Sequence, residues 1–216
     1  MFWKDASTFL PILLEGLRLT VLVTLGSLLL STVLGLVWAL MRVSRYRALV
    51  FAAKSIVNVI RGIPILVLLF YIYFVMPELG VTLTAVQSAI IGLGIAYSAY
   101  QAENFRAGIE AIDHGQIEAA QSLGMGWAMM MRRVVLPQAV RIVLPPYGNT
   151  MVMMLKDSSQ ASTITVAELT LKGQMLAAST FKNSTVFTLV ALLYLVMSVP
   201  LILLVGWLER RTQRRR

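Results

Sequence analysis

The sequence of 216 residues has no cysteine and a single histidine, His114. The absence of cysteine excludes disulfide bonds, iron–sulfur clusters and thiol chemistry. One histidine without cysteine also leaves no cluster with the ligand spacing of a zinc or redox site. No Gly-Lys dipeptide occurs, which excludes a phosphate-binding loop of the Gly-Lys-Ser/Thr type. We therefore expect the chain to bind no metal or cofactor of its own.

Charged residues are also scarce, at 13% of the chain, whereas hydrophobic residues make up 58%. A soluble globular domain is about a quarter charged and about half apolar. The composition therefore indicates an integral membrane protein with little mass outside the bilayer. The net charge of +9 is no sign of nucleic-acid binding, because the basic residues cluster at the ends of apolar runs.

The apolar residues form five stretches, each near the length of about 20 residues that a membrane-spanning helix needs. No alternating strand pattern competes with them, so the sequence predicts an all-α integral membrane fold in a single domain, 10–210. The first stretch is too long for a signal-peptide core and is expected to remain as an anchor. The expected spans are about 11–41, 55–76, 85–102, 139–156 and 186–208, with interruptions at Arg61-Gly62-Ile63-Pro64 in the second and at Pro145-Pro146 in the fourth.

The basic residues predict how these spans are oriented, because Lys and Arg accumulate on the cytoplasmic side. Four basic residues lie on one side of the expected spans: Lys4, Lys156, Lys172 and Lys182. Thirteen lie on the other: Arg42, Arg45, Arg47, Lys54, Arg106, Arg132, Arg133, Arg141, Arg210, Arg211, Arg214, Arg215 and Arg216. The N-terminus is therefore expected outside and the C-terminus inside, with the basic tail 211–216 held against anionic lipid.

Two connections, 103–138 inside and 157–185 outside, are long enough to suggest function, and both are expected to be partly helical. In the inner one, a short helix is expected to stop at Gly124, followed by a helical piece over 127–135 that ends before Pro137. Ala119 and Ala120 carry so little side chain that a partner protein can approach closely. A plain helical hairpin that covers the end of the bundle explains this stretch equally well.

This inner stretch resembles a known motif. Glu118-Ala119-Ala120, three residues, Gly124, nine residues, Val134, one residue and Leu136-Pro137 match the EAA loop of permease subunits of binding-protein-dependent ABC importers. Several stretches are similar to the polar amino-acid uptake branch, the histidine/glutamine/glutamate group. They are Leu14–Thr20, Arg61–Pro64, Ala102–Ile109, Gly115-Gln116 and Leu155–Ser159, where Ser158 stands in place of the usual threonine and Gln160 in place of a common leucine.

The resemblance implies a permease subunit, not an enzyme, that moves a polar amino acid across the bacterial inner membrane by alternating access. Its partners would be a second permease subunit, identical or paralogous, two ATPase subunits that bind ATP and Mg, and a soluble substrate-binding protein. The coupling helix would contact the ATPase through Glu118, Ala119, Ala120 and Gly124, with Leu136 and Pro137 completing the motif.

Ionisable groups beyond the fourth span are candidates for the substrate pathway, because they are costly at membrane depth unless they face water, a cavity or a partner. Lys156, Asp157 and Glu168 complement the two charged ends of an amino acid, and Glu168 is the better placed of the two acids. A structural ion pair of Lys156 with either acid is the alternative. The other candidates are Asn149, Ser158, Ser159, Thr163 and Arg61, the last as part of a gate or as a snorkelling cation.

Two other functions are weighed against the importer. A small secondary transporter is disfavoured because the hydropathy pattern shows no repeated halves. A membrane-embedded enzyme is disfavoured because the spans hold no Ser/His or His/carboxylate constellation. An ion pair between Glu103 and Arg106, three residues apart on one helical face, is expected to be structural.

Overall fold

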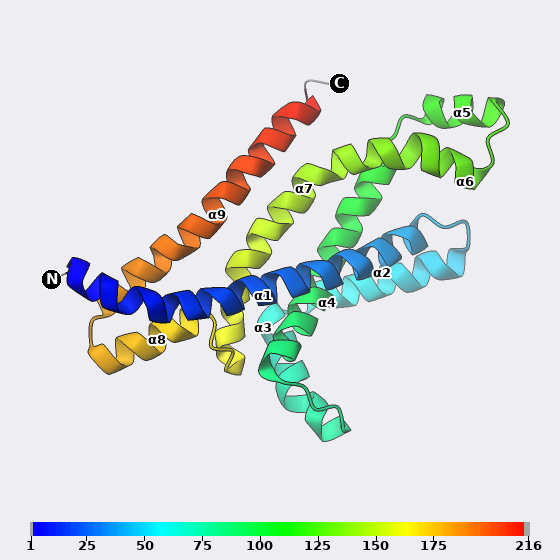
Figure 1. Cartoon of the computed structure of the whole chain (residues 1–216). Coiled ribbons are helices and arrows are strands. Elements are labelled where there is room, and N and C mark those ends of the chain that lie inside the picture. The colour runs from blue at the N-terminus through cyan, green and yellow to red at the C-terminus, as the bar shows by residue number, and fades with distance from the viewer. Residues whose placement is uncertain (1, 214–216) are drawn as a thin grey trace.

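The structure, a computed structural model, describes residues 2–213, and within this range it consists of helices joined by short connections, with no strand (Figure 1). The all-α expectation is confirmed. Arg214–Arg216, which belong to the expected basic tail, lie outside the described residues. The long helices are α1 (Phe2–Arg42), α2 (Arg47–Gly62), α4 (Ala85–Glu110), α7 (Leu136–Asp157), α8 (Leu169–Thr180) and α9 (Asn183–Gln213). The shorter ones are α3 (Ile65–Phe70), α5 (His114–Ser122), α6 (Trp127–Met130), the π-helices η1 (Tyr71–Val75) and η3 (Met131–Val135), and the 3-10 helices η2 (Met76–Leu79) and η4 (Ser158–Ile164).

Two of these helices, α1 and α9, are long and apolar enough to cross a membrane alone, and α2 with the segment Ile65–Leu79 makes a third if the bent pair is one span. The helices α4 and α7 contain the expected spans 85–102 and 139–156, but they carry more polar residues. The strongly apolar spans are therefore two to three, and the count of five stays a prediction.

The expected break in the second span is a sharp bend of 98°. Pro64 has no N–H to donate, and its ring disfavours the helical conformation for the residue before it. Ile63 accordingly adopts an extended backbone, with φ −100° and ψ 128°. The stretch 55–76 is thus two helical segments that point in different directions.

The expectations for the prolines of the fourth span were wrong. A helix over 127–135 was expected to end before Pro137, yet α6, η3 and α7 follow one another without a gap. Pro137 lies where the π-helix η3 passes into α7, and the side-chain amide of Gln138 donates to the Val134 carbonyl at 3.0 Å. Local π adjustments of this kind let a membrane helix accommodate proline. The helix also continues through Pro145 and Pro146, as packing within membrane bundles permits.

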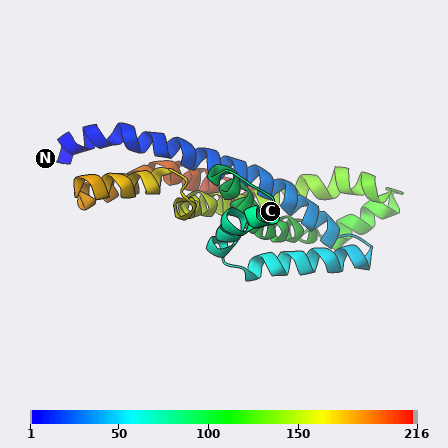
Figure 2. The same cartoon turned by 90° about the horizontal axis from the view of Figure 1, so that it is seen from below.

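Small residues let the helices of this one chain approach closely. A Cβ added to Gly94 would lie 2.6 Å from the Leu30 side chain of α1, and one added to Gly92 would lie 2.7 Å from Leu69 of α3. Seen from below (Figure 2), α4 lies between α1 and α2. The small-residue face of α4 therefore serves packing inside the subunit.

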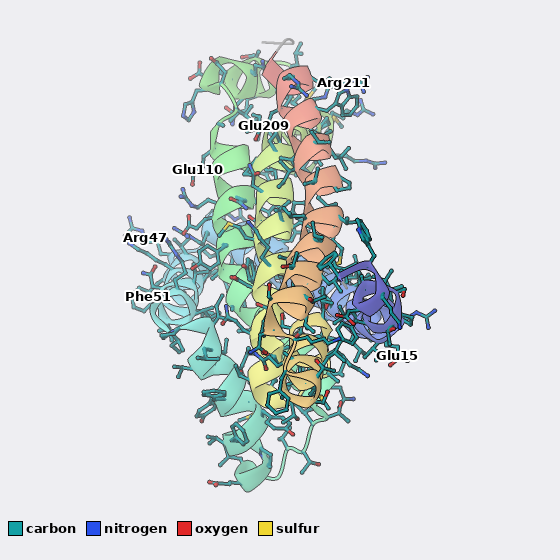
Figure 3. The ribbon with its side chains drawn as sticks, turned by 90° about the vertical axis from the view of Figure 1, so that its left-hand side faces the viewer. Glu15, Arg47, Phe51, Glu110, Glu209 and Arg211 are labelled. Carbon is teal, nitrogen blue, oxygen red and sulfur yellow. The ribbon has the colours of Figure 1, made fainter. Side chains whose placement is uncertain are left out.

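The two ends of the bundle differ. At one end, ion pairs fasten α1 to the segments after α7, with Lys172 of α8 3.0 Å from Glu15 and Lys182 2.5 Å from Asp5. The other end holds α5, α6 and the end of α9 (Figure 1). Figure 3 shows Glu110, Glu209 and Arg211 gathered toward this second end.

Candidate functional site

The first candidate region is the helical hairpin of α5, α6 and η3, which protrudes at one end of the bundle (Figure 1). The Asp113 side chain caps α5 by accepting the Gly115 N–H at 2.7 Å. At the other end of α5, the Gly124 N–H donates to the Gln121 carbonyl at 2.8 Å and the Met125 N–H donates to the Ala120 carbonyl at 3.1 Å. Gly124 has φ +74°, so the expected left-handed helix stop is confirmed.

The hairpin exposes large apolar side chains. Leu123, Trp127 and Met129 are 77%, 64% and 47% exposed. Glu118 and Ala119 are exposed beside them. A surface of this kind is typical of a contact with another protein.

Ala120 does not belong to this exposed surface, contrary to its expected role at the contact. Its side chain is 3% exposed and packs in a cluster with residues of η3 and α7, including Met131, Val135 and Ala139. The small side chain allows α5 to lie close to the helix behind it. Leu136 and Pro137 are exposed at the start of α7.

The second region is a cluster of charges around Glu103, which lies on α4 beyond the apolar stretch 85–102. Arg106 donates to its carboxylate at 2.8 Å and 3.0 Å, Arg42 of α1 also pairs with it, and Arg61 of α2 lies 3.7 Å away. Arg106 further pairs with Glu110. The expected Glu103–Arg106 pair is confirmed, and Arg61 belongs to this cluster, which joins α1, α2 and α4.

These contacts shift the pKa values of both partners. Burial alone would raise the pKa of Glu103, but the hydrogen bonds and charges of Arg106 and Arg42 outweigh it and hold that pKa below its usual value. The hydrogen bonds that Arg106 donates to Glu103 and Glu110 raise the pKa of Arg106. Both shifts favour the charged forms of Glu103 and Arg106, and the ion pairs of the cluster tie α1, α2 and α4 together.

The third region is the fully buried Glu168, which precedes α8. Its two carboxylate oxygens accept the N–H groups of Thr170 and Leu171, both at 2.9 Å, and the hydroxyls of Tyr194 at 3.0 Å and Thr20 at 3.4 Å. All four donors are neutral, and no cation in residues 2–213 pairs with Glu168 within 4.0 Å. The alternative of a structural Lys156–Glu168 ion pair is therefore wrong, because a helix N-terminus and two hydroxyls provide the compensation instead.

The fourth region is the junction of α7 and η4. Asp157 is partly exposed and accepts a single hydrogen bond, from the Tyr97 hydroxyl at 2.7 Å. Lys156 is exposed, and no ion pair within 4.0 Å joins it to a carboxylate of the described residues. The alternative of a structural Lys156–Asp157 ion pair is therefore also wrong.

The hydroxyl candidates beside Asp157 make local bonds. Ser158 donates to the Leu155 carbonyl and Thr163 to the Gln160 carbonyl, both at 2.7 Å, and the Ser159 carbonyl accepts from Ser162 at 2.7 Å. These residues lie together in η4, within seven positions of Asp157.

Two candidates lie elsewhere. Asn149 is exposed and donates to Glu209 of α9 at 3.2 Å, and Arg61 lies in the Glu103 cluster. Sequence reasoning did not find Thr20, Tyr97 and Tyr194, although tyrosine inside an apolar run is a sign of a buried hydroxyl that needs a partner. Their partners are 148, 60 and 26 positions away along the chain, so no local pattern could identify them.

A bundle of apolar helices with buried polar groups and a protruding apolar hairpin defines a membrane component that works with other proteins. The chain belongs to the family of binding-protein-dependent transport system inner membrane components, whose family model matches residues 31–214. It is therefore the permease subunit of a transport system and is not catalytic by itself.

Individual relatives agree with this assignment. The chain is 39% identical to the probable amino-acid ABC transporter permease protein YckA of Bacillus subtilis, over 88% of this chain and 84% of that one. It is 36% identical to the probable glutamine ABC transporter permease protein GlnM of the same organism, over 93% of each. A crystal structure of an amino acid ABC transporter with histidines matches with a TM-score of 0.90 and 37% identity, covering 96% of this chain and 97% of that one.

Proposed function

We propose that this chain moves a polar amino acid into the cell across the bacterial inner membrane by alternating access. Two permease subunits would form the pathway, two separate ATPase subunits would bind ATP and Mg, and a soluble binding protein would deliver the substrate. The observation that carries this proposal is the exposed apolar hairpin with the spacing of the EAA loop. The names of the two relatives and of the matching crystal structure support the amino-acid substrate.

The proposed topology has five spans, with α4 and α7 completing the set. Both are long enough to cross, at 26 and 22 residues, and small or buried residues line much of their length. Their polar residues would face other helices instead of lipid. The excess of basic residues at the end that holds α5 supports a cytoplasmic location for this end and an outer location for α8.

In the proposed coupling, Glu118 and Ala119 contact the ATPase together with the exposed apolar side chains of the hairpin. Ala120 and Gly124 act by shaping the hairpin, because Ala120 lets α5 pack closely and Gly124 reverses the chain. Leu136 and Pro137 begin the helix that leads from the hairpin into the membrane.

For the substrate, we propose that Asp157 binds the ammonium group. Its carboxylate has only the Tyr97 donor and is partly exposed, so it has acceptor capacity left, whereas four donors occupy Glu168. Exposed Lys156 can bind the substrate carboxylate. Ser158, Ser159 and Thr163 would shape this site. Glu168, Asn149 and Arg61 would not contact the substrate but would hold the helices around the pathway in position.

The test is ATP hydrolysis by the transporter reconstituted with its ATPase and binding protein, screened over amino acids. Stimulation by one or a few polar amino acids is expected. Stimulation by none of them, with the complex assembled and the basal hydrolysis intact, would exclude the proposed substrate class but leave the permease assignment in place.

A further inference from the structure

An apolar groove of about 310 Å³ lies between α1, α4 and α7, and it meets the hairpin region at the lining residues Leu136 and Ala139. Leu36 of α1, Ile109 of α4 and Val140, Val143 and Leu144 of α7 are among the side chains that line it. Its two hydroxyls, on Thr32 and Tyr147, lie 2.8 Å apart and hydrogen bond to each other, so neither needs water.

Water is a poor occupant of such a groove. An apolar cavity stays dry, because a water molecule needs two or more polar partners. The volume lies within the roughly 300–1,000 Å³ of ligand-binding pockets. Val140 is 54% exposed, so the groove opens at the surface of α7. For a helix in a bilayer, the apolar material at that surface is lipid chain.

The charges next to the groove favour a particular lipid. Arg132 lies in the π-helix η3, which leads directly into the lining residue Leu136, so it lies near the end of the groove. Arg132 and Arg133 are exposed, and the whole stretch 119–156 contains no Asp or Glu. Arg132 and Arg133 thus place positive charge at the end of the groove that faces α5. Of the acids near this end, Glu110 is paired with Arg106 and Asp113 caps α5, and no ion pair within 4.0 Å joins exposed Glu118 to an arginine of the described residues.

We propose that this groove binds one acyl chain of an anionic phospholipid, with the phosphate of its headgroup at Arg132. In the orientation proposed above, this lipid belongs to the inner leaflet. The apolar lining of the groove binds the acyl chain, and Arg132 provides the preference for an anionic headgroup. The proposal concerns lipid and does not depend on which substrate is transported.

The test uses the assembled transporter in nanodiscs that contain equal amounts of phosphatidylglycerol and phosphatidylcholine, with retained lipid counted by mass spectrometry after extraction into detergent. The native protein is expected to retain phosphatidylglycerol preferentially. Val140→Trp fills the groove from its open side and should remove the retained lipid. Met153→Trp is the matched control, because Met153 is 52% exposed on the same helix but does not line the groove.

A second pair of variants tests the headgroup. Arg132→Gln should lower the retention of phosphatidylglycerol about fivefold, the effect of one basic residue at an anionic surface, and leave phosphatidylcholine unchanged. Arg210→Gln removes a charge from the end of α9, away from the lining residues, and should change neither. The proposal would be overturned if Val140→Trp retained as much phosphatidylglycerol as the native protein. It would also be overturned if Arg132→Gln left the retention of phosphatidylglycerol unchanged.

A third measurement separates lipid from a protein occupant and holds even if Val140→Trp fails to fold. Because the chain has no cysteine, Val140→Cys places one thiol at the mouth of the groove. A fluorophore on this thiol should be quenched by phospholipids with brominated chains. Disulfide cross-linking between two copies through Val140→Cys, without such quenching, would show that a second copy covers the groove and would refute lipid binding.

Discussion

At the scale of single residues, the two acids on either side of η4, Asp157 and Glu168, differ in how completely their oxygens are bonded. Glu168 is buried and has four neutral donors, whereas Asp157 has one. A carboxylate with its acceptor positions filled stabilises the structure around it. One with free positions can bind a ligand. Substitution of Glu168 should therefore affect stability, whereas substitution of Asp157 should affect substrate binding.

Glu168→Ala should lower the stability of the assembled transporter by at least about 1 kcal/mol, because it removes the cap of α8 and strands buried donors. The half-saturating substrate concentration should not change in the protein that does assemble. Thermal unfolding and substrate-stimulated ATP hydrolysis measure the two effects. A changed half-saturation with normal stability would contradict the structural role.

Asp157→Asn should give the reverse result. Losing a charge-assisted contact of about 1.5–3 kcal/mol raises the half-saturating concentration about tenfold to a hundredfold. The asparagine side chain can still accept the Tyr97 hydroxyl, so assembly should be normal. An unchanged half-saturation would exclude Asp157 as the ammonium ligand.

Glu103 predicts an acid-sensitive contribution to stability. The pKa of Glu103 is lower in the folded protein than in the unfolded chain, where it is about 4.3. Its ion pairs therefore stabilise the fold fully at pH values above this unfolded pKa. This stabilisation is lost as the pH falls from there through the lowered pKa. Thermal unfolding of the native protein between about pH 7 and 3 should show this loss. Glu103→Gln should be less stable at neutral pH and should lack that part of the acid dependence.

At the scale of elements, the sequence predicted what local conformation decides and missed what packing decides. The stop at Gly124 and the break at Pro64 follow from backbone geometry, and both were found. Pro137 and Pro145 are expected from the sequence to interrupt the helix, but the π-helix η3 before Pro137 and the packing around α7 accommodate them. The surroundings of Ala120 and Glu168 depend on residues of other elements, which no spacing along the chain reveals.

Two glycines of the hairpin allow a matched test of the coupling proposal. Gly124→Ala puts a side chain at φ +74° and should cost about 1–2 kcal/mol locally, which distorts the hairpin. Gly126→Ala is the control, because Gly126 has φ −64° and an added Cβ meets no atom within 4 Å. Co-purification with the ATPase and uptake should fall in Gly124→Ala alone. Equal behaviour of the two variants would refute the role of Gly124.

At the scale of the whole molecule, the orientation proposed from the basic residues can be tested with single thiols. Thr82→Cys, in the exposed turn before α4, should react with an impermeant reagent added outside intact cells. Gln213→Cys, at the end of α9, should react only after the membrane is opened. The opposite pattern would reverse the topology and, with it, the assignment of the hairpin to the cytoplasm.

The uninterrupted run from α6 through η3 to α7 has a mechanical consequence. Measured along its bent axis (Figure 1), the run from Trp127 to Asp157 is about 45 Å long at about 1.5 Å per residue, more than the hydrocarbon thickness of a bilayer. The hairpin sits at one end of this rod and the Asp157–Tyr97 pair at the other. We expect the rod to act as a lever, so that a tilt imposed on the hairpin by the ATPase displaces Asp157 directly. The π-turn of η3, one residue wider than an α-helical turn, is the place where such a lever would flex.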